Sequence, residues 1–399
     1  MGRFFQHPGF DFEMRIALGA VAYGVAEAGE LLATAQGIAD GDFDAWFDGW
    51  TATAERVAGV AAAAEAAGRK VSAREAWLRA SKYHAMAFFF VLGTRDPSRS
   101  LASFRAMRAA FDRAMALWPT HVAAVAIPYE GRRLKGYWFD PDGDPRPRPL
   151  AILVNGSDGP VVDMIPMGVA AGLARGWRVL VFDGPGQGVA LYEDGLVFRP
   201  DWEAVIGPVL DFALARPGVD PERVALLGVS QAGYWVPRAA AFEPRVKAIV
   251  ADPGVTRVWS SWFDHLPPEM AGMFARGDRA TFDAWMAEGA RDTPAALRFE
   301  MEKRAEPYGL TGLWDLLTEV RKYDLTGVVE RIRCPALVCD PEEEAFWPGQ
   351  SAELFAALTC PKTLAPFTAA EGASGHCEPL APALRNQRVF DWLEATLGL

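Results

Sequence analysis

The stretch Gly228-Val229-Ser230-Gln231-Ala232-Gly233 decides the fold. The apolar run Val224–Val229 precedes the serine, and residues with helical spacing follow it. A G-x-S-x-G pattern between a strand and a helix indicates a nucleophile elbow, a tight turn that exposes its serine at the end of a sheet. Ala232 takes the last position of that pattern here, and alanine is small enough for the turn. We therefore predict that Ser230 is a nucleophile, the alternative being a serine that merely ends a strand.

Short apolar runs alternate with helical stretches from about residue 122 onward. This alternation predicts an α/β fold, with a mostly parallel sheet covered by helices on both faces. A strand-free stretch at about 257–329 interrupts it and predicts a lid-like insertion. The predicted strands are Val122–Tyr129, Leu134–Phe139, Leu150–Val154, Arg178–Phe182, Val224–Val229, Val246–Ala251 and Ala336–Cys339. The predicted helices between them are Val161–Arg175, Asp201–Ala215, Gln231–Phe242, Pro348–Leu358 and Leu384–Leu397.

Residues 1–121 differ from the rest of the chain in composition and in the spacing of their apolar residues. They are rich in Ala, Leu, Arg and Glu, with apolar residues three and four apart, so we predict a helical N-terminal region before a domain at 122–399. Ser72 followed by Glu75 predicts a capping box at the start of one of these helices. The run Tyr83–Val91 is apolar nearly all round. Its helix should therefore be buried between domains or subunits.

A serine nucleophile needs a base, and the sequence offers one well-placed histidine. His376 lies in a small-residue-rich loop before the last predicted helix, late enough in the chain to reach the elbow. We predict that His376 is the base. The remaining histidines are assigned structural or substrate-facing roles: His7, His84, His121 and His265.

The acid that orients the histidine is expected in the loop after the strand Ala336–Cys339. We favour Glu344, because the acid usually lies a few residues past the strand. The order serine, acid, histidine along the chain fits an elbow-type hydrolytic site. The alternatives left open by the sequence are Glu343, Glu342, Asp340 and, after the preceding strand, Asp252.

Two backbone N–H groups are the expected donors to a developing oxyanion. One belongs to Gln231, directly after the nucleophile. The other should come from the loop Asn155–Gly159, which follows a strand, and Ser157 is our choice within it. A second glycine-rich loop, Asp183–Gly188, lacks the spacing and the lysine of nucleotide-binding loops. We predict no cofactor and no metal site.

Composition excludes several classes of protein. The 399 residues carry 40 Lys and Arg against 51 Asp and Glu, a net charge of −11. An acidic surface without a basic run disfavours nucleic acid as a partner. The sequence contains no run of 18 uncharged apolar residues that could span a membrane. Its first ten residues also lack the pattern of a signal peptide. Four cysteines without paired spacing form no disulfide scaffold or zinc site. We expect a cytoplasmic protein.

Together these residues resemble the α/β-hydrolase superfamily. Within it, the chain is similar to the branch that contains 2,6-dihydroxypseudooxynicotine hydrolase, the fungal pigment chain-shortening hydrolases and the FrsA-type esterases. The resemblance extends from about residue 40 to residue 399 and departs from the family pattern at Ala232, at Asn155-Gly156 in place of two glycines, and at glutamate as the acid. It is carried by Ala73–Ser81, Phe182–Gly188, the Ser230 elbow and Gly375-His376-Cys377.

The resemblance implies an activity and an assembly. Members of this branch cleave esters or a carbon–carbon bond beside a ketone, and their N-terminal helices form a cap and a dimer contact. We therefore expect a homodimeric serine hydrolase acting on a small apolar carbonyl compound, with an aromatic or polyketide-like body. Two alternatives remain: a natural-product lyase or cyclase that uses the same site, and a non-catalytic ligand-binding protein on a hydrolase scaffold.

Overall fold

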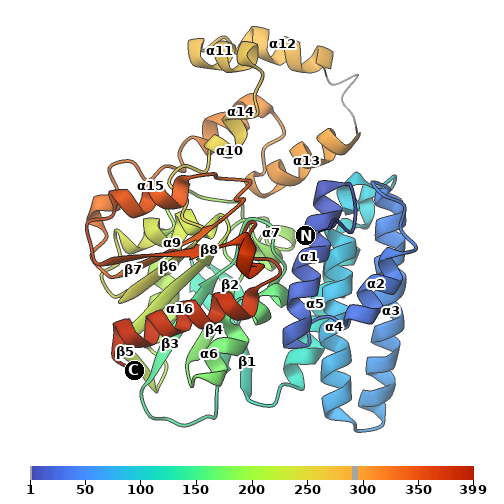
Figure 1. Cartoon of the computed structure of the whole chain (residues 1–399), viewed down its shortest axis with the longest axis vertical. Helices are drawn as coiled ribbons and strands as arrows, with labels where there is room; N and C mark the ends of the chain where they lie inside the picture. Colours follow the sequence, from blue (N-terminus) through green and yellow to red (C-terminus); the bar gives the residue numbers. More distant parts are fainter. Residues whose placement is uncertain (1, 290–294) are drawn as a thin grey trace.

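A single eight-stranded sheet forms the centre of the computed structural model, which describes residues 2–289 and 295–399 (Figure 1). Its strand order is β1-β2-β4-β3-β5-β6-β7-β8. The pairs β1–β2 and β2–β4 are antiparallel, and the other neighbours are parallel. The predicted α/β fold class is confirmed. The strands are β1 (His121–Tyr129), β2 (Arg132–Asp140), β3 (Arg148–Val154), β4 (Arg178–Phe182), β5 (Val219–Val229), β6 (Ala248–Asp252), β7 (Ala336–Pro341) and β8 (Lys362–Phe367).

Both faces of the sheet are buried, as the apolar strands predict. In β3, Ala151 and Leu153 join one core cluster, whereas Ile152 and Val154 join the other, because successive side chains of a strand point to opposite faces. The first cluster packs against α6 (Ala170–Ala174) and α16 (Pro382–Leu397). The second packs against α8 (Glu203–Leu214), α9 (Ala232–Ala240) and α15 (Gln350–Ala357).

Five helices precede the sheet and stand beside it, shown in blue to cyan in Figure 1. The segment Tyr83–Val91, predicted to be buried, spans the end of α4 and the start of the 3-10 turn that follows, and its residues are buried except for the half-buried Phe89. The first helix packs closely on the chain after β8, since a Cβ on Gly19 would lie 2.0 Å from the Pro379 oxygen. These helices are α1 (Pro8–Ala20), α2 (Ala28–Ala35), α3 (Phe43–Ala66), α4 (Lys70–Phe89) and α5 (Ser100–Ala116).

Helices also fill the predicted insertion between β6 and β7, of which residues 290–294 lie outside the described part. At its far end from the sheet are α11 and α12, whereas α13 returns toward the N-terminal helices (Figure 1). Phe299 of α13 meets Phe43 and Phe90, with ring centroids 5.0 and 5.3 Å apart. The helices are α10 (Ser260–Phe263), α11 (Pro268–Arg276), α12 (Arg279–Gly289), α13 (Ala295–Ala305) and α14 (Leu313–Val320). Nowhere in the described chain is a helix long and apolar enough to cross a membrane.

Two local expectations were wrong, and one strand was missed. The capping box at Ser72 does not form, because α4 already begins at Lys70. The single helix expected at 161–175 is broken into a 3-10 turn, a π turn and α6, since Pro166 has no N–H to donate and Gly168 adopts a φ of 150°. The sequence analysis also missed β8, a half-exposed edge strand with few buried residues.

A buried ion pair ties the last helix to the middle of the sheet. Arg385 of α16 and Asp252 at the end of β6 both have fully buried side chains, and Nε and Oδ2 lie 2.7 Å apart. The guanidinium also donates to the Met167 carbonyl at 2.7 Å. Burial of these charges is tolerated because they are of opposite sign and directly paired.

Arg385→Met should lower the free energy of unfolding by about 3–5 kcal/mol, because it leaves Asp252 buried and uncompensated. Urea denaturation measures the change. Arg388→Met is the matched control on the same helix: Arg388 pairs with Glu371 while 31% and 37% exposed, and exposed pairs contribute about 0–1 kcal/mol. Equal losses in the two variants would contradict this account of the pair.

Candidate active site

Ser230 occupies a strained turn between β5 and α9. Its φ of 59° lies in the left-handed region that non-glycine residues rarely adopt, and such strain is a feature of nucleophile elbows. A hydrogen bond of 2.6 Å from the Ser230 N–H to the Asp252 carbonyl holds the turn. The conformation presents the serine side chain at the carboxyl end of the strand.

The glycines around Ser230 explain the shifted sequence pattern. A Cβ on Gly228 would lie 2.3 Å from the Ala232 carbonyl oxygen, and one on Gly233 would lie 1.8 Å from the Pro253 oxygen. Both contacts are with backbone, which cannot move aside at low cost. The Ala232 side chain is itself fully buried in the core. The close approach therefore falls on Gly233, and alanine is accommodated one residue earlier.

His376 lies against Ser230. Its Nε2 is 2.8 Å from the Ser230 Oγ, although the two residues are 146 positions apart in the sequence. The imidazole is buried among aromatic rings, with centroid distances of 4.6 Å to Phe346, 5.8 Å to Trp347 and 6.2 Å to Phe12. Since Phe12 belongs to α1, the N-terminal helices reach the histidine directly.

Glu344 contacts the other nitrogen of the same ring, with Oε2 2.7 Å from His376 Nδ1. Its second oxygen accepts the N–H groups of Phe346 and Trp347 at 2.8 and 3.1 Å. Burial alone would raise the pKa of Glu344, but the His376 charge and these hydrogen bonds lower that pKa below its ordinary value. An anionic Glu344 favours the tautomer that carries its proton on Nδ1, which leaves Nε2 free to accept the Ser230 proton.

The other four carboxylates considered from the sequence are not at the histidine. Glu342 accepts the Ala369 N–H at 2.6 Å, and Glu343 accepts the Ser374 hydroxyl at 2.9 Å. Asp252 is paired with Arg385. Within the described contacts Asp340 has no bond to His376, and burial raises its pKa.

The loop after β3 packs on the nucleophile. A Cβ on Gly156 would lie 2.8 Å from the Ser230 Cβ. The Gly156 N–H is already bound to the Asn155 side chain at 2.8 Å. Within the described contacts the Ser157 N–H is bound to nothing, as is that of Gln231 at the start of α9. These two N–H groups remain the predicted oxyanion donors.

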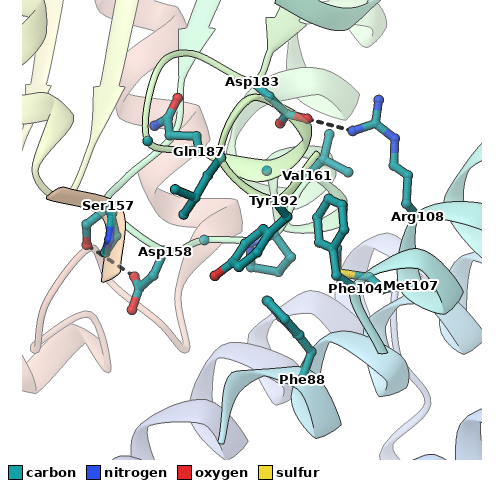
Figure 2. Close-up of a pocket in the computed structure, with 16 residues that line it drawn as sticks. Phe88, Phe104, Met107, Arg108, Ser157, Asp158, Val161, Asp183, Gln187 and Tyr192 are labelled. Atoms are coloured by element: carbon teal, nitrogen blue, oxygen red, sulfur yellow. Dashed lines mark hydrogen bonds and ion pairs between the residues drawn. The ribbon is translucent and has the colours of Figure 1, made fainter. Parts of the chain in front are cut away.

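Gln187 was missed by the sequence analysis, which considered its loop only as a nucleotide site. Its buried amide donates to the carbonyls of Asn155 and Gly156 at 2.7 and 2.8 Å, and so fixes the loop beside Ser230. Asp183, at the start of the same segment, accepts a 2.6 Å bond from Arg108 of α5 (Figure 2). No local pattern in the sequence marks Gln187, because its role depends on two carbonyls more than 30 residues away.

A cavity lies between the N-terminal helices and the loop of Ser157 (Figure 2). Its enclosed volume is about 30 Å³, which is much smaller than a typical small-molecule pocket. Ser157 lines the cavity, and the preceding residue, Gly156, packs against Ser230, so one side of the cavity lies near Ser230. The walls are contributed mainly by Phe88, Phe104, Met107, Arg108, Asp158, Val161 and Tyr192.

A mostly parallel eight-stranded sheet with an elbow serine after its central strand defines the α/β-hydrolase class of fold. The chain belongs to the alpha/beta hydrolase family, whose model matches residues 151–392. It is a hydrolase.

Relatives match the chain over its whole length. The sequence is 32% identical to hydrolase LUC6 of Fusarium sp over 415 aligned residues, covering 100% of this chain and 99% of that protein. It is 30% identical to 20-hydroxy-prefusarin hydrolase FUS2 of Gibberella moniliformis, with 100% and 99% covered. Among solved structures, 2,6-dihydroxy-pseudo-oxynicotine hydrolase has a TM-score of 0.73 at 19% identity, with 95% of each chain covered. That structure supports the fold, including the N-terminal helices.

Gly233→Ala should distort the elbow, because its methyl would lie 1.8 Å from the Pro253 oxygen; overpacking of this kind costs about 1–3 kcal/mol. We expect a lower melting temperature and a large loss of p-nitrophenyl acetate hydrolysis. Ala232→Gly is the neighbouring control and should cost about 0.5–1 kcal/mol while retaining the activity. If Gly233→Ala were as active as Ala232→Gly, the steric explanation of the shifted pattern would be wrong.

Proposed function

We propose that the protein is a serine hydrolase with Ser230 as nucleophile, His376 as base and Glu344 as the acid that orients it. The observation that carries the proposal is the continuous pair of contacts, 2.8 Å from Ser230 Oγ to His376 Nε2 and 2.7 Å from His376 Nδ1 to Glu344. Such a relay makes a hydroxyl nucleophilic at neutral pH.

In the proposed reaction, His376 takes the Ser230 proton as Oγ attacks a substrate carbonyl carbon. Glu344 stabilises the imidazolium, and the N–H groups of Gln231 and Ser157 donate to the oxyanion. One such donor contributes about 3–4 kcal/mol to the transition state. The imidazolium then protonates the leaving group, an alkoxide from an ester or a carbanion from a ketone. His376 next deprotonates a water that attacks the acyl-serine, and it returns this proton to Ser230 Oγ as the acid leaves.

The proposed substrate is a small carbonyl compound with an apolar, aromatic or polyketide-like body. The aromatic and aliphatic side chains on the walls of the cavity beside Ser157 support this choice, because they offer dispersion contacts to an apolar body. The relative FUS2 is named for hydrolysis of 20-hydroxy-prefusarin, and this is consistent with a sizeable organic substrate.

A fluorophosphonate probe should label the wild-type protein at Ser230, and peptide mapping by mass spectrometry locates the adduct. Ser230→Ala should abolish labelling and p-nitrophenyl ester hydrolysis with little change in melting temperature, because it removes a single hydroxyl. The residual rate should be no more than the ~10³–10⁴ over water that remains when a triad member is lost. Labelling at another residue, or an inert wild-type serine, would refute the proposal.

Glu344→Gln should lower kcat by about 10⁴, because an amide favours the wrong histidine tautomer. Glu343→Gln is the matched control: it is the adjacent residue and receives the same change, but it binds Ser374 and not His376. Its kcat should stay within about threefold of wild type, since isolated surface substitutions have small effects. Similar losses in both variants would exclude Glu344 as the specific acid.

A further inference from the structure

Two buried charged groups near the active site have no partner of opposite charge. Glu13 of α1 and Lys303 of α13 are each 5% exposed. Within the described residues, the Glu13 carboxyl makes no hydrogen bond or ion pair. The Lys303 ammonium has no ion pair and lies over the rings of Phe88 and Phe89, 5.1 and 5.2 Å from their centroids. Buried polar groups are normally satisfied, so both call for an explanation.

The nearby Lys82 does not supply the missing partner. Its fully buried ammonium is already bound to Asp163, at 2.8 and 2.9 Å from the two carboxylate oxygens. It is therefore a closed pair between α4 and the turn after β3. Glu378, a third buried group whose oxygens lack a described hydrogen bond, lies by the Asp252–Arg385 pair. Glu13 of α1 and Lys303 of α13 therefore remain without an ion-pair partner among the described residues.

Glu13 belongs to a segment of α1 that reaches the active site. The preceding residue on α1, Phe12, packs on the His376 ring at 6.2 Å. On the other side, Gly156 lies against Ser230, and Asp158 follows two residues later in the same loop. Asp158 is near enough to act on the pKa of Glu13. Figure 2 shows Asp158 and Phe88 on the walls of the cavity beside this loop.

The surroundings of Glu13 favour its neutral form. Burial raises its pKa to about 8; the charge of Lys82 opposes the rise, Asp163 and Asp158 add to it, and Lys303 opposes it. These four groups come from α4, the turn after β3, the loop after β3 and α13, which are the elements whose charges face Glu13. At neutral pH the carboxyl is therefore mostly protonated and is a hydrogen-bond donor.

We propose that Glu13 and Lys303 form a polar subsite that binds an accepting oxygen, of a ketone or a carboxylate, on the body of the substrate. A protonated carboxyl and an ammonium are both donors, and one oxygen or two close oxygens would satisfy them together. The inference deepens the proposed function, on which it rests, by adding a polar requirement to an otherwise apolar substrate. Because α1 and α13 each supply one donor, the subsite is complete only when both segments are in place.

Binding in a Ser230→Ala background tests the subsite without requiring hydrolysis. The probes are p-nitroanilides of 4-oxopentanoic, 5-oxohexanoic and 6-oxoheptanoic acids, each compared with the anilide of the plain acid of the same length. The mono-anilide of adipic acid tests a carboxylate. Calorimetry at pH 6.5 should show at least one oxygen-bearing probe binding about tenfold tighter than its match, as expected for hydrogen bonds that involve a charged group. Ketone and carboxylate probes separate the two possible sources of the oxygen.

The preference for oxygen should be lost in both Glu13→Leu and Lys303→Met. Arg298→Met is the matched control, because Arg298 is an exposed cation on the same helix as Lys303, and it should retain the preference. Melting temperatures identify any variant that fails to fold. If Glu13→Leu fails to fold, Glu13→Gln replaces it, because glutamine keeps a hydrogen-bond donor and nearly the same shape. The Glu13→Gln variant should retain the preference for oxygen at pH 6.5.

The pH dependence gives a second readout. Ionisation of Glu13 removes its donor and adds a repelling charge, so the preference for a ketone probe should fall about tenfold as pH rises from about 6.5 to 9.5. In Glu13→Gln it should be independent of pH. The subsite is refuted if no probe pair shows a preference, if the preference survives Glu13→Leu or Lys303→Met, or if it grows with pH. Failure of Ser230 labelling would refute the proposed mechanism and leave these binding results unaffected.

Discussion

Asp252 at the end of β6 is the residue on which the arrangement of the site depends. Its carbonyl accepts the Ser230 N–H at 2.6 Å and the Cys377 thiol at 3.3 Å. Since Cys377 follows His376, one backbone oxygen holds both the Ser230 turn and the His376 loop. The Asp252 carboxylate, fully buried, is held by Arg385 of α16 at 2.7 Å. The buried ion pair thus stabilises the point at which the two halves of the site meet.

The N-terminal helices support the same loop from the opposite side. Gly19 of α1 allows the Pro379 carbonyl to approach to a distance that a side chain would forbid, and Phe12 covers the His376 ring. Farther along, Arg108 of α5 binds Asp183 in the segment that includes Gln187, and Gln187 fixes the loop of Gly156. The helices therefore act on both the histidine side and the serine side of the site, although they lie outside the sheet.

The three departures from the family pattern each have a local physical reason. At the elbow, the steric limit falls on Gly233, which leaves room for Ala232. In the loop after β3, the Asn155 side chain accepts the Gly156 N–H and donates to the Gly159 carbonyl. These hydrogen bonds stabilise the turn, although asparagine stands where the family pattern has a glycine. The longer side chain of Glu344 reaches His376 while two backbone N–H groups hold its other oxygen. Precise placement here comes from hydrogen bonds to the carboxylate, which do not require aspartate.

The sequence predicted what local patterns determine and missed what distant contacts determine. Apolar runs located seven strands, and the elbow pattern located Ser230, because both signals lie within a few consecutive residues. The sequence left Asp252 and Glu344 as alternatives, because one ends a strand and the other follows one. The contacts that separate them join distant residues: Asp252 binds Arg385, and Glu344 binds His376. The roles of Gln187 and Glu13 could not be predicted from the sequence for a related reason. The role of a buried polar side chain depends on the groups that surround it in the folded protein. The groups proposed to hold a substrate are of this second kind, so they are recognised only in the structure, whereas Ser230 and His376 were proposed from the sequence.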